Sequence, residues 1–125
     1  MVFKDKEVRV ILEEEVNEVY KELNEIVGGE IKKGILKSEH QVLLKSINRA
    51  IELLKNNPFI GIQIPKRLIP KKYIEKFDVT NLWKFNLANY WRMIYTVTSE
   101  EIKIISFILD IVDHKTYDRL FGYKK

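Results

Sequence analysis

The sequence has no cysteine and only two histidines, His40 and His114, among its 125 residues. The absence of cysteine excludes disulfides, thiolate metal sites and a cysteine nucleophile. The two histidines lie too far apart in the chain to suggest a zinc site. We therefore expect neither a metal nor a cofactor.

Glycine and proline are also scarce, with 5 and 3 residues, while 46% of the chain is apolar. This composition disfavours disorder and low-complexity repeats. No stretch approaches the ~20 apolar residues of a membrane span, and the charged start of the chain, Lys4 to Glu7, is not typical of a signal peptide. We expect one domain over residues 1–125, in the cytoplasm and with no membrane partner.

Positive charge is concentrated in the second half of the chain. Residues 1–60 carry 10 basic and 11 acidic side chains, whereas residues 61–125 carry 12 and 7. Such an excess is compatible with nucleic-acid binding, although it also occurs in proteins that bind none.

The first half predicts one strand and two helices. Alternation of Val8 and Val10 with polar residues indicates a short strand, and a helix follows from Glu13 with Gly28 and Gly29 as its stop. Its apolar stripe is Val16, Val19, Tyr20, Leu23 and Ile26. A capping box of Ser38 and Gln41 begins the second helix, which ends at Asn57 before a proline.

A long surface loop is expected from residue 59 to residue 78. It contains two prolines and a run of basic residues, Lys66, Arg67, Lys71 and Lys72. These cations suit contacts with an RNA backbone, but a solvated loop would look the same.

Three strands are predicted after this loop, over residues 81–87, 90–98 and 102–109, with a short helical tail over 113–122. The last strand is apolar on both faces and should be central in the sheet. Tyr117, Leu120 and Phe121 would form the buried side of the tail. The fold class is therefore α+β, in the order β-α-α-β-β-β with a short C-terminal helix. The two N-terminal helices should pack on one face of a mainly antiparallel sheet.

Lys84 and Arg92 fall on one face of this sheet, opposite the aromatic residues of the first two strands. Strand alternation places Lys84 with Asn86, and Arg92 with Ile94 and Thr96. A hairpin centred on Ala88 would set Lys84 across from Arg92. Because like charges facing each other cost stability, the pair suggests a bound anion such as phosphate.

Several segments resemble the RelE/ParE toxin superfamily, especially its archaeal RelE-like members. They are "LLKNNPFIGIQIPKRL", with Asn57, Pro58 and Gly61, then "WRMIY" at Trp91 to Tyr95, and His114 shortly before Tyr117. The resemblance covers most of the chain. It implies a small toxin that an antitoxin, helical and acidic or amphipathic, neutralises. In the RelE branch the toxin cleaves mRNA in the ribosomal A site, and in the ParE branch it inhibits DNA gyrase.

The resemblance also implies roles for individual residues. Arg92 matches the arginine that contacts the scissile phosphate, Lys84 matches a lysine of the preceding strand, and Tyr117 corresponds to the terminal tyrosine. A second lysine of RelE falls at Asn86, and the C-terminal arginine has no firm match near His114. These departures favour the alternative of a ParE-like or degenerate, non-catalytic binder.

Metal-free RNA cleavage uses the neighbouring 2′-hydroxyl as nucleophile and needs a base, a cation for the phosphate and an acid. Arg92 suits the phosphate, because its guanidinium stays charged and can bond two oxygens. Lys84 could act as a cation or a base, His114 as acid or base, and Tyr117 by stacking or proton transfer. The alternatives are an ion pair of Arg92 with Glu100, Glu101 or Asp110, an ion pair of His114 with Asp110 or Asp113, and simple packing of Tyr117.

Overall fold

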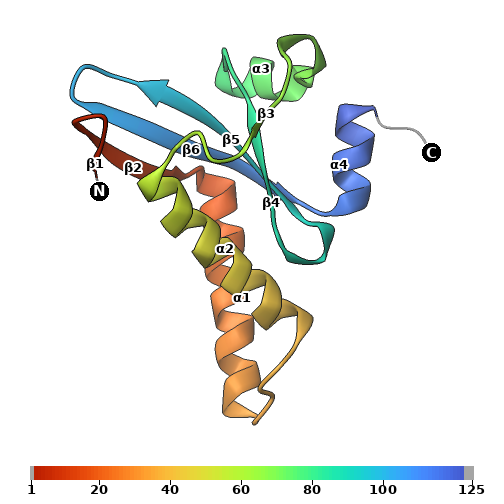
Figure 1. Cartoon of the computed structure of the whole chain (residues 1–125). Helices are drawn as coiled ribbons and strands as arrows, with labels where there is room; N and C mark the ends of the chain where they lie inside the picture. The colour runs from red at the N-terminus through yellow and green to blue at the C-terminus, as the bar shows by residue number, and fades with distance from the viewer. Residues whose placement is uncertain (1, 123–125) are drawn as a thin grey trace.

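The computed structural model describes residues 2–122 and shows one six-stranded mixed sheet with helices (Figure 1). The strand order is β1-β2-β6-β5-β4-β3, and only β2 and β6 pair in parallel. The strands are β1 (Val2–Phe3), β2 (Lys6–Leu12), β3 (Ile62–Gln63), β4 (Trp83–Asn86), β5 (Arg92–Ser99) and β6 (Lys103–Val112). The helices are α1 (Glu14–Lys32), α2 (Glu39–Asn56), α3 (Lys71–Phe77) and α4 (His114–Phe121), with 3-10 turns η1 (Lys66–Leu68) and η2 (Ala88–Tyr90). The α+β class and the mainly antiparallel sheet are confirmed.

Helix α1 is longer than the sequence suggested. It does not stop at Gly28 and Gly29 but continues to Lys32. Each glycine costs an exposed helix roughly 1 kcal/mol relative to alanine. The buried Val27 just before them, together with bonds from Glu30, holds the last turn in place.

Glu30 joins the two long helices at the tip of their hairpin. Its carboxylate accepts hydrogen bonds from Ser38 Oγ (2.5 Å) and Gln41 Nε2 (3.2 Å), and His40 Nδ1 lies 2.9 Å away. These bonds, that of Ser38 first, hold the pKa of Glu30 below its usual value. Ser38 caps α2 as predicted, since its Oγ accepts from the Gln41 N–H at 3.1 Å. The Gln41 side chain bonds Glu30 instead of completing the capping box.

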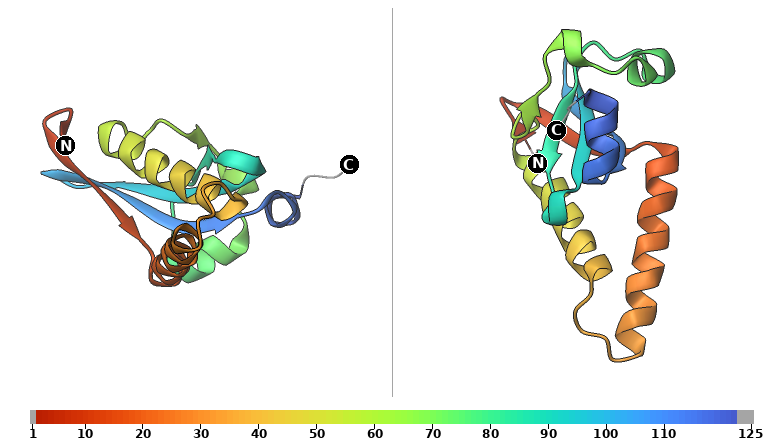
Figure 2. Two further views of the ribbon diagram at one scale, coloured as in Figure 1. Left: turned by 90° about the horizontal axis from the view of Figure 1, so that it is seen from below. Right: turned by 90° about the vertical axis from the view of Figure 1, so that its right-hand side faces the viewer.

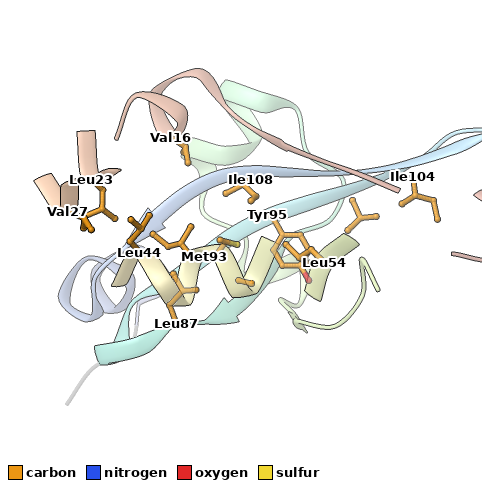
Figure 3. Packing of buried hydrophobic residues seen from close by; sticks show 13 residues of the cluster. Val16, Leu23, Val27, Leu44, Leu54, Leu87, Met93, Tyr95, Ile104 and Ile108 are labelled. Atoms are coloured by element: carbon orange, nitrogen blue, oxygen red, sulfur yellow. The ribbon is translucent and has the colours of Figure 1, made fainter. Parts of the chain in front are cut away.

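Helices α1 and α2 cover one face of the sheet and build the first core (Figures 1 and 3). This face carries the aromatic and apolar side chains that strand alternation placed there, including Met93, Tyr95 and Val97. Figure 3 shows Met93, Tyr95 and Ile108 of the strands close to Leu44 and Leu54 of α2. The prediction of two N-terminal helices on one face is confirmed.

A second core lies on the opposite face, under α3 and α4. Figure 2 shows α2 and α3 on opposite sides of the strands. Its buried residues are Ile64, Tyr73, Leu82, Ile94, Leu109, Val112, Tyr117 and Phe121. Strand β6 lies between β2 and β5 and contributes to both cores, as its apolar pattern predicted. The helical tail is also confirmed, with Tyr117 and Phe121 buried and Leu120 partly buried.

The segment from residue 59 to residue 78 is not a plain surface loop, contrary to expectation. It forms β3, η1 and α3, and Tyr73 is fully buried. Lys71 and Lys72 open α3, while Tyr73 and Phe77, four residues apart, turn toward the sheet. The sequence did not predict α3, because only two of its seven residues pack into the core and most of the others are charged. None of the helices within residues 2–122 is long and apolar enough to cross a membrane.

Gly61, just before β3, has no room for a side chain. Its N–H donates to Tyr95 Oη at 3.0 Å, and an added Cβ would lie 2.5 Å from both that oxygen and the backbone oxygen of Lys84. We therefore expect Gly61→Ala to lower the free energy of unfolding by about 1–3 kcal/mol, because the backbone of β4 cannot yield cheaply.

Gly28→Ala is the matched control, since nothing lies within 4 Å of its added Cβ. In a helix this change should instead raise stability, by about 0.4–1 kcal/mol. Urea unfolding of both variants measures the contrast. Equal midpoints for the two variants would contradict the close approach at Gly61.

Candidate active site

Lys84 and Arg92 do lie on one face of the sheet, but not opposite each other. Asn86 is the partner of Arg92, and Lys84 pairs with Ile94, so the predicted Lys84–Arg92 register is wrong by two residues. The turn centres on Asn89 instead of Ala88. A shift of two residues preserves the faces of the strands, and the two cations therefore still share a surface.

Tyr117 of α4 brings the two cations together. Its ring centroid lies 5.0 Å from Lys84 Nζ and 5.4 Å from Arg92 Cζ. The ring is 2% exposed, and both cations are half-buried. We call Lys84, Arg92 and Tyr117 the cation site. Cation–π contact of this kind is worth ~0.5–2 kcal/mol, which offsets part of the repulsion between the two positive charges.

No carboxylate within residues 2–122 lies within 4.0 Å of either cation of this site. Arg92 does not pair with Glu100, Glu101 or Asp110; its Nη1 donates to the Trp91 carbonyl at 3.2 Å. Arg92 Nε is buried and, among the described residues, has no hydrogen-bond partner. A buried donor without a partner is costly. Because the residue as a whole is only half-buried, it is the Nη groups of the guanidinium that could bond a phosphate.

Asp110, Tyr73 and Lys72 form a second polar group on the same face, which we call the Asp110 cluster. Asp110 Oδ2 accepts from Tyr73 Oη at 3.0 Å and lies 3.1 Å from Lys72 Nζ. Burial, followed by the Asp110 charge, raises the pKa of Tyr73 well above its ordinary value. Tyr73 and Tyr117 belong to the same buried core, so the Asp110 cluster adjoins the cation site.

A β-bulge explains why strand alternation did not place Asp110 here. Tyr95 pairs with Ile108 but Ile94 pairs with Asp110, so Leu109 is an extra residue in β6. Without it Asp110 would share the face of Ile108, under α1 and α2. The bulge re-aims Asp110 toward α3.

His114 lies at the start of α4, one turn before Tyr117. Its Nε2 is 3.3 Å from Asp118 Oδ2, and its ring centroid is 5.9 Å from that of Tyr90. The carboxylate next to His114 is therefore that of Asp118, not that of Asp110 or Asp113 as the alternative had it. Asp113 instead caps α4 by accepting from the Thr116 N–H at 2.8 Å, which lowers the pKa of Asp113. The Nδ1 of His114 is buried without a partner among the described residues.

An open depression adjoins Arg92. It is lined by Asn86, Leu87, Asn89, Tyr90 and Arg92. Asn86 is exposed at the end of β4, directly across from Arg92. A ligand phosphate on Arg92 would therefore have an amide and an aromatic ring close by.

A second crevice, of about 160 Å³, lies between the start of α1 and α3. Four of the charged side chains that line it are already paired: Lys76 with Glu15 at 3.1 Å, and Lys72 with Asp110 at 3.1 Å. These pairs fix α3 against the body of the protein and leave their charges satisfied. We therefore assign the candidate site to the face of Arg92, where Lys84 and Arg92 have no such partners in the part of the chain that the structure describes.

Only one of the four basic residues of the run from Lys66 to Lys72 lies in a cluster next to the cation site. Lys72 belongs to the Asp110 cluster, whereas Lys66, Arg67 and Lys71 are exposed on η1 and at the start of α3. No ion pair involves these three within residues 2–122. They extend the positive surface from α3 without forming a defined pocket.

Sequence reasoning missed Tyr73, Tyr90 and Asp110. Tyr73 lay in a presumed loop, and the bulge that turns Asp110 leaves no composition signal. Tyr90 could have been noticed from the Asn before it, because asparagine at a predicted turn is compatible with a left-handed backbone. Residues 2–122 hold no group of three or more histidine, aspartate or glutamate side chains that could bind a metal ion. Comparison with protein-family models, curated proteins and solved structures gave no match for this chain.

Proposed function

We propose that the protein is the toxin of a type II toxin–antitoxin system, a RelE-like endonuclease that cleaves mRNA on the ribosome. The observation that carries the proposal is the cation site: two half-buried cations over one buried tyrosine, with no carboxylate of residues 2–122 within 4.0 Å of either cation. Such a site favours a bound anion, and a phosphodiester is the anion of this reaction. The sequence resemblance supplies the substrate class, since the geometry alone would fit other phosphates.

In the proposed reaction the 2′-hydroxyl attacks the adjacent phosphorus and the 5′ oxygen leaves. Arg92 bonds the phosphate oxygens, on which negative charge accumulates in the transition state. Lys84 adds a second positive charge from the neighbouring strand. In this proposal His114, one helical turn before Tyr117 in α4, would exchange a proton with the attacking or the leaving oxygen, which requires its Nε2 to leave Asp118. Tyr117 holds the two cations in place through its ring.

The partners follow from this proposal. The toxin acts in the cytoplasm on the ribosome and its mRNA, and an antitoxin with an acidic or amphipathic helix neutralises it. Lys66, Arg67 and Lys71 would contact ribosomal RNA through its phosphates, and each contact would make binding more dependent on salt.

A non-catalytic role is the second candidate, and the position of His114 favours it. Its Nε2 is held by Asp118 and its ring faces Tyr90, not the ring of Tyr117. If this histidine cannot reach the reacting oxygens, the site would bind RNA, the antitoxin or a topoisomerase without cutting.

Induced expression with primer extension separates the two candidates. We expect the wild-type protein to arrest growth and to give discrete cuts in a reporter message in a ribosome-containing translation extract. Both effects should disappear in Arg92→Ala. Arrest without cuts would instead support gyrase inhibition or binding alone, and a folded wild-type protein that neither arrests growth nor cuts would refute the toxin.

A further inference from the structure

The turn η2 presents an aromatic ring to solvent beside Arg92. Tyr90 is 72% exposed, whereas Tyr73, Tyr95 and Tyr117 are buried. Figure 1 shows the turn between β4 and β5 next to the start of α4. An exposed tyrosine by itself indicates no function. Three observations, however, suggest a function for Tyr90.

The first observation is its backbone. Tyr90 has φ of +64°, and Asn89 before it has φ of +56°. Asparagine adopts this left-handed conformation readily, but a bulky tyrosine does so rarely. Glycine or asparagine would relieve the strain, so the tyrosine at this position is explained by its ring and not by the turn.

The second observation is the anchoring of the turn. The Leu87 N–H donates to the Trp91 carbonyl at 2.8 Å, and the Ala88 N–H donates to Ser46 Oγ of α2 at 3.2 Å. Leu87 is buried in the first core. The ring is therefore carried by a turn that both the hairpin and α2 hold.

The third observation is what surrounds the ring. Tyr90 lies on the rim of the depression that Asn86 and Arg92 line. The His114 ring lies 5.9 Å away, inclined by 54°, and braces Tyr90 from α4. Arg92 is half-buried and forms no ion pair within residues 2–122, so it is the residue of this depression that would bind a phosphate. Because Tyr90 and Arg92 line the same depression, a base attached to that phosphate would lie near the Tyr90 ring.

We propose that Tyr90 is a stacking platform for a nucleobase of single-stranded RNA, next to the phosphate bound at Arg92. This inference rests on the proposed function and adds a binding residue that the resemblance did not indicate. Stacking of this kind tolerates any base, because every base has a flat π face. Asn86 lines the same depression, and its amide would bond the edge of the stacked base.

Cleavage in the translation extract, quantified per cut site by primer extension, tests the platform. Tyr90→Ala and Tyr90→Gly should lower the rate about 10- to 100-fold, in the range of one lost base stack. Tyr90→Phe keeps the ring and should stay within about twofold of wild type. Tyr90→Gly should at the same time raise the midpoint of thermal unfolding, because glycine accepts the left-handed backbone. A slower but more stable variant cannot be explained by misfolding.

The outcomes separate this inference from the proposed function. If the wild type cuts and Tyr90→Gly cuts equally well, the platform is refuted and the nuclease stands. If Tyr90→Phe loses as much as Tyr90→Ala, the hydroxyl and not the ring matters, and stacking is again refuted. If the wild type and Arg92→Ala both leave the message intact, the nuclease fails and the platform fails with it.

Discussion

Between pH 10 and pH 12 the free energy of unfolding is expected to fall by about 4 kcal/mol, because two buried tyrosines, Tyr73 and Tyr95, resist ionisation. Burial raises the pKa of Tyr95 to about 12. Burial and the Asp110 carboxylate raise the pKa of Tyr73 well above its usual range. Both rings are fully buried in the folded protein.

The sign follows from proton binding. In the unfolded chain these hydroxyls ionise near pH 10, whereas in the folded protein they stay protonated. Their contribution is therefore fully present below pH 10 and is lost as the pH rises toward the folded pKa. Each retained proton costs roughly 1.4 kcal/mol of stability per pH unit.

Urea unfolding at intervals from pH 8 to pH 12 measures this loss. Tyr73→Phe and Tyr95→Phe should each reduce the slope above pH 10 by about one proton. Both lower the starting stability too, because Asp110 and the Gly61 N–H lose a partner, so the slope is the informative quantity. Tyr90→Phe changes a ring that is 72% exposed and is the control. A stability that does not change from pH 10 to pH 12 in the wild type would show that these hydroxyls are not buried.

Replacing Arg92 with alanine is expected to lower the rate of message cleavage about 10²- to 10³-fold. A preorganised donor facing the developing charge is worth ~2.7–4 kcal/mol in comparable electrostatic sites. Arg92→Lys should recover only part of this rate, because an ammonium cannot make the two parallel bonds of a guanidinium.

Stability should respond differently from activity. Arg92→Ala removes one of two cations that share the Tyr117 ring and have no ion pair among the described residues, so the free energy of unfolding should change little or rise. Arg49→Ala, at an exposed position of α2 on the other side of the sheet, is the matched control. If the Arg92→Ala protein is folded and cuts at the wild-type rate, Arg92 does not take part in the reaction.

Most of the sheet could be predicted because its pattern is local. The alternation from Trp83 to Val97 fixes which side chains share a face, and the structure preserves that assignment. The register depends instead on the turn. Asn89 and Tyr90 adopt left-handed conformations that move its centre by one residue, and no pattern of apolar residues encodes that choice.

The positions of Asp110 and of helix α3 could not be predicted, because they depend on features that leave no periodic pattern in the sequence. One inserted residue in β6 moved Asp110 across the sheet, and two inward residues turned a basic stretch into α3. Gly28 and Gly29 misled in the opposite direction, since packing of Val27 and the bonds of Glu30 outweigh their preference for a helix end. In each case tertiary contacts overrode the local signal.

The pairing of β2 with β6 has a consequence for synthesis of the chain. Glu7 of β2 lies beside Lys103 of β6, and the sheet is divided between the first and last parts of the chain. As a nascent chain leaves the ribosome, β2 and the hairpin of α1 and α2 emerge long before their central neighbour. The sheet cannot close until residue 112 has cleared the exit tunnel, and Arg92 reaches its place over Tyr117 only after that. The cation site is thus assembled only after β6 and α4 have been made, so the proposed activity depends on segments that emerge long after β2.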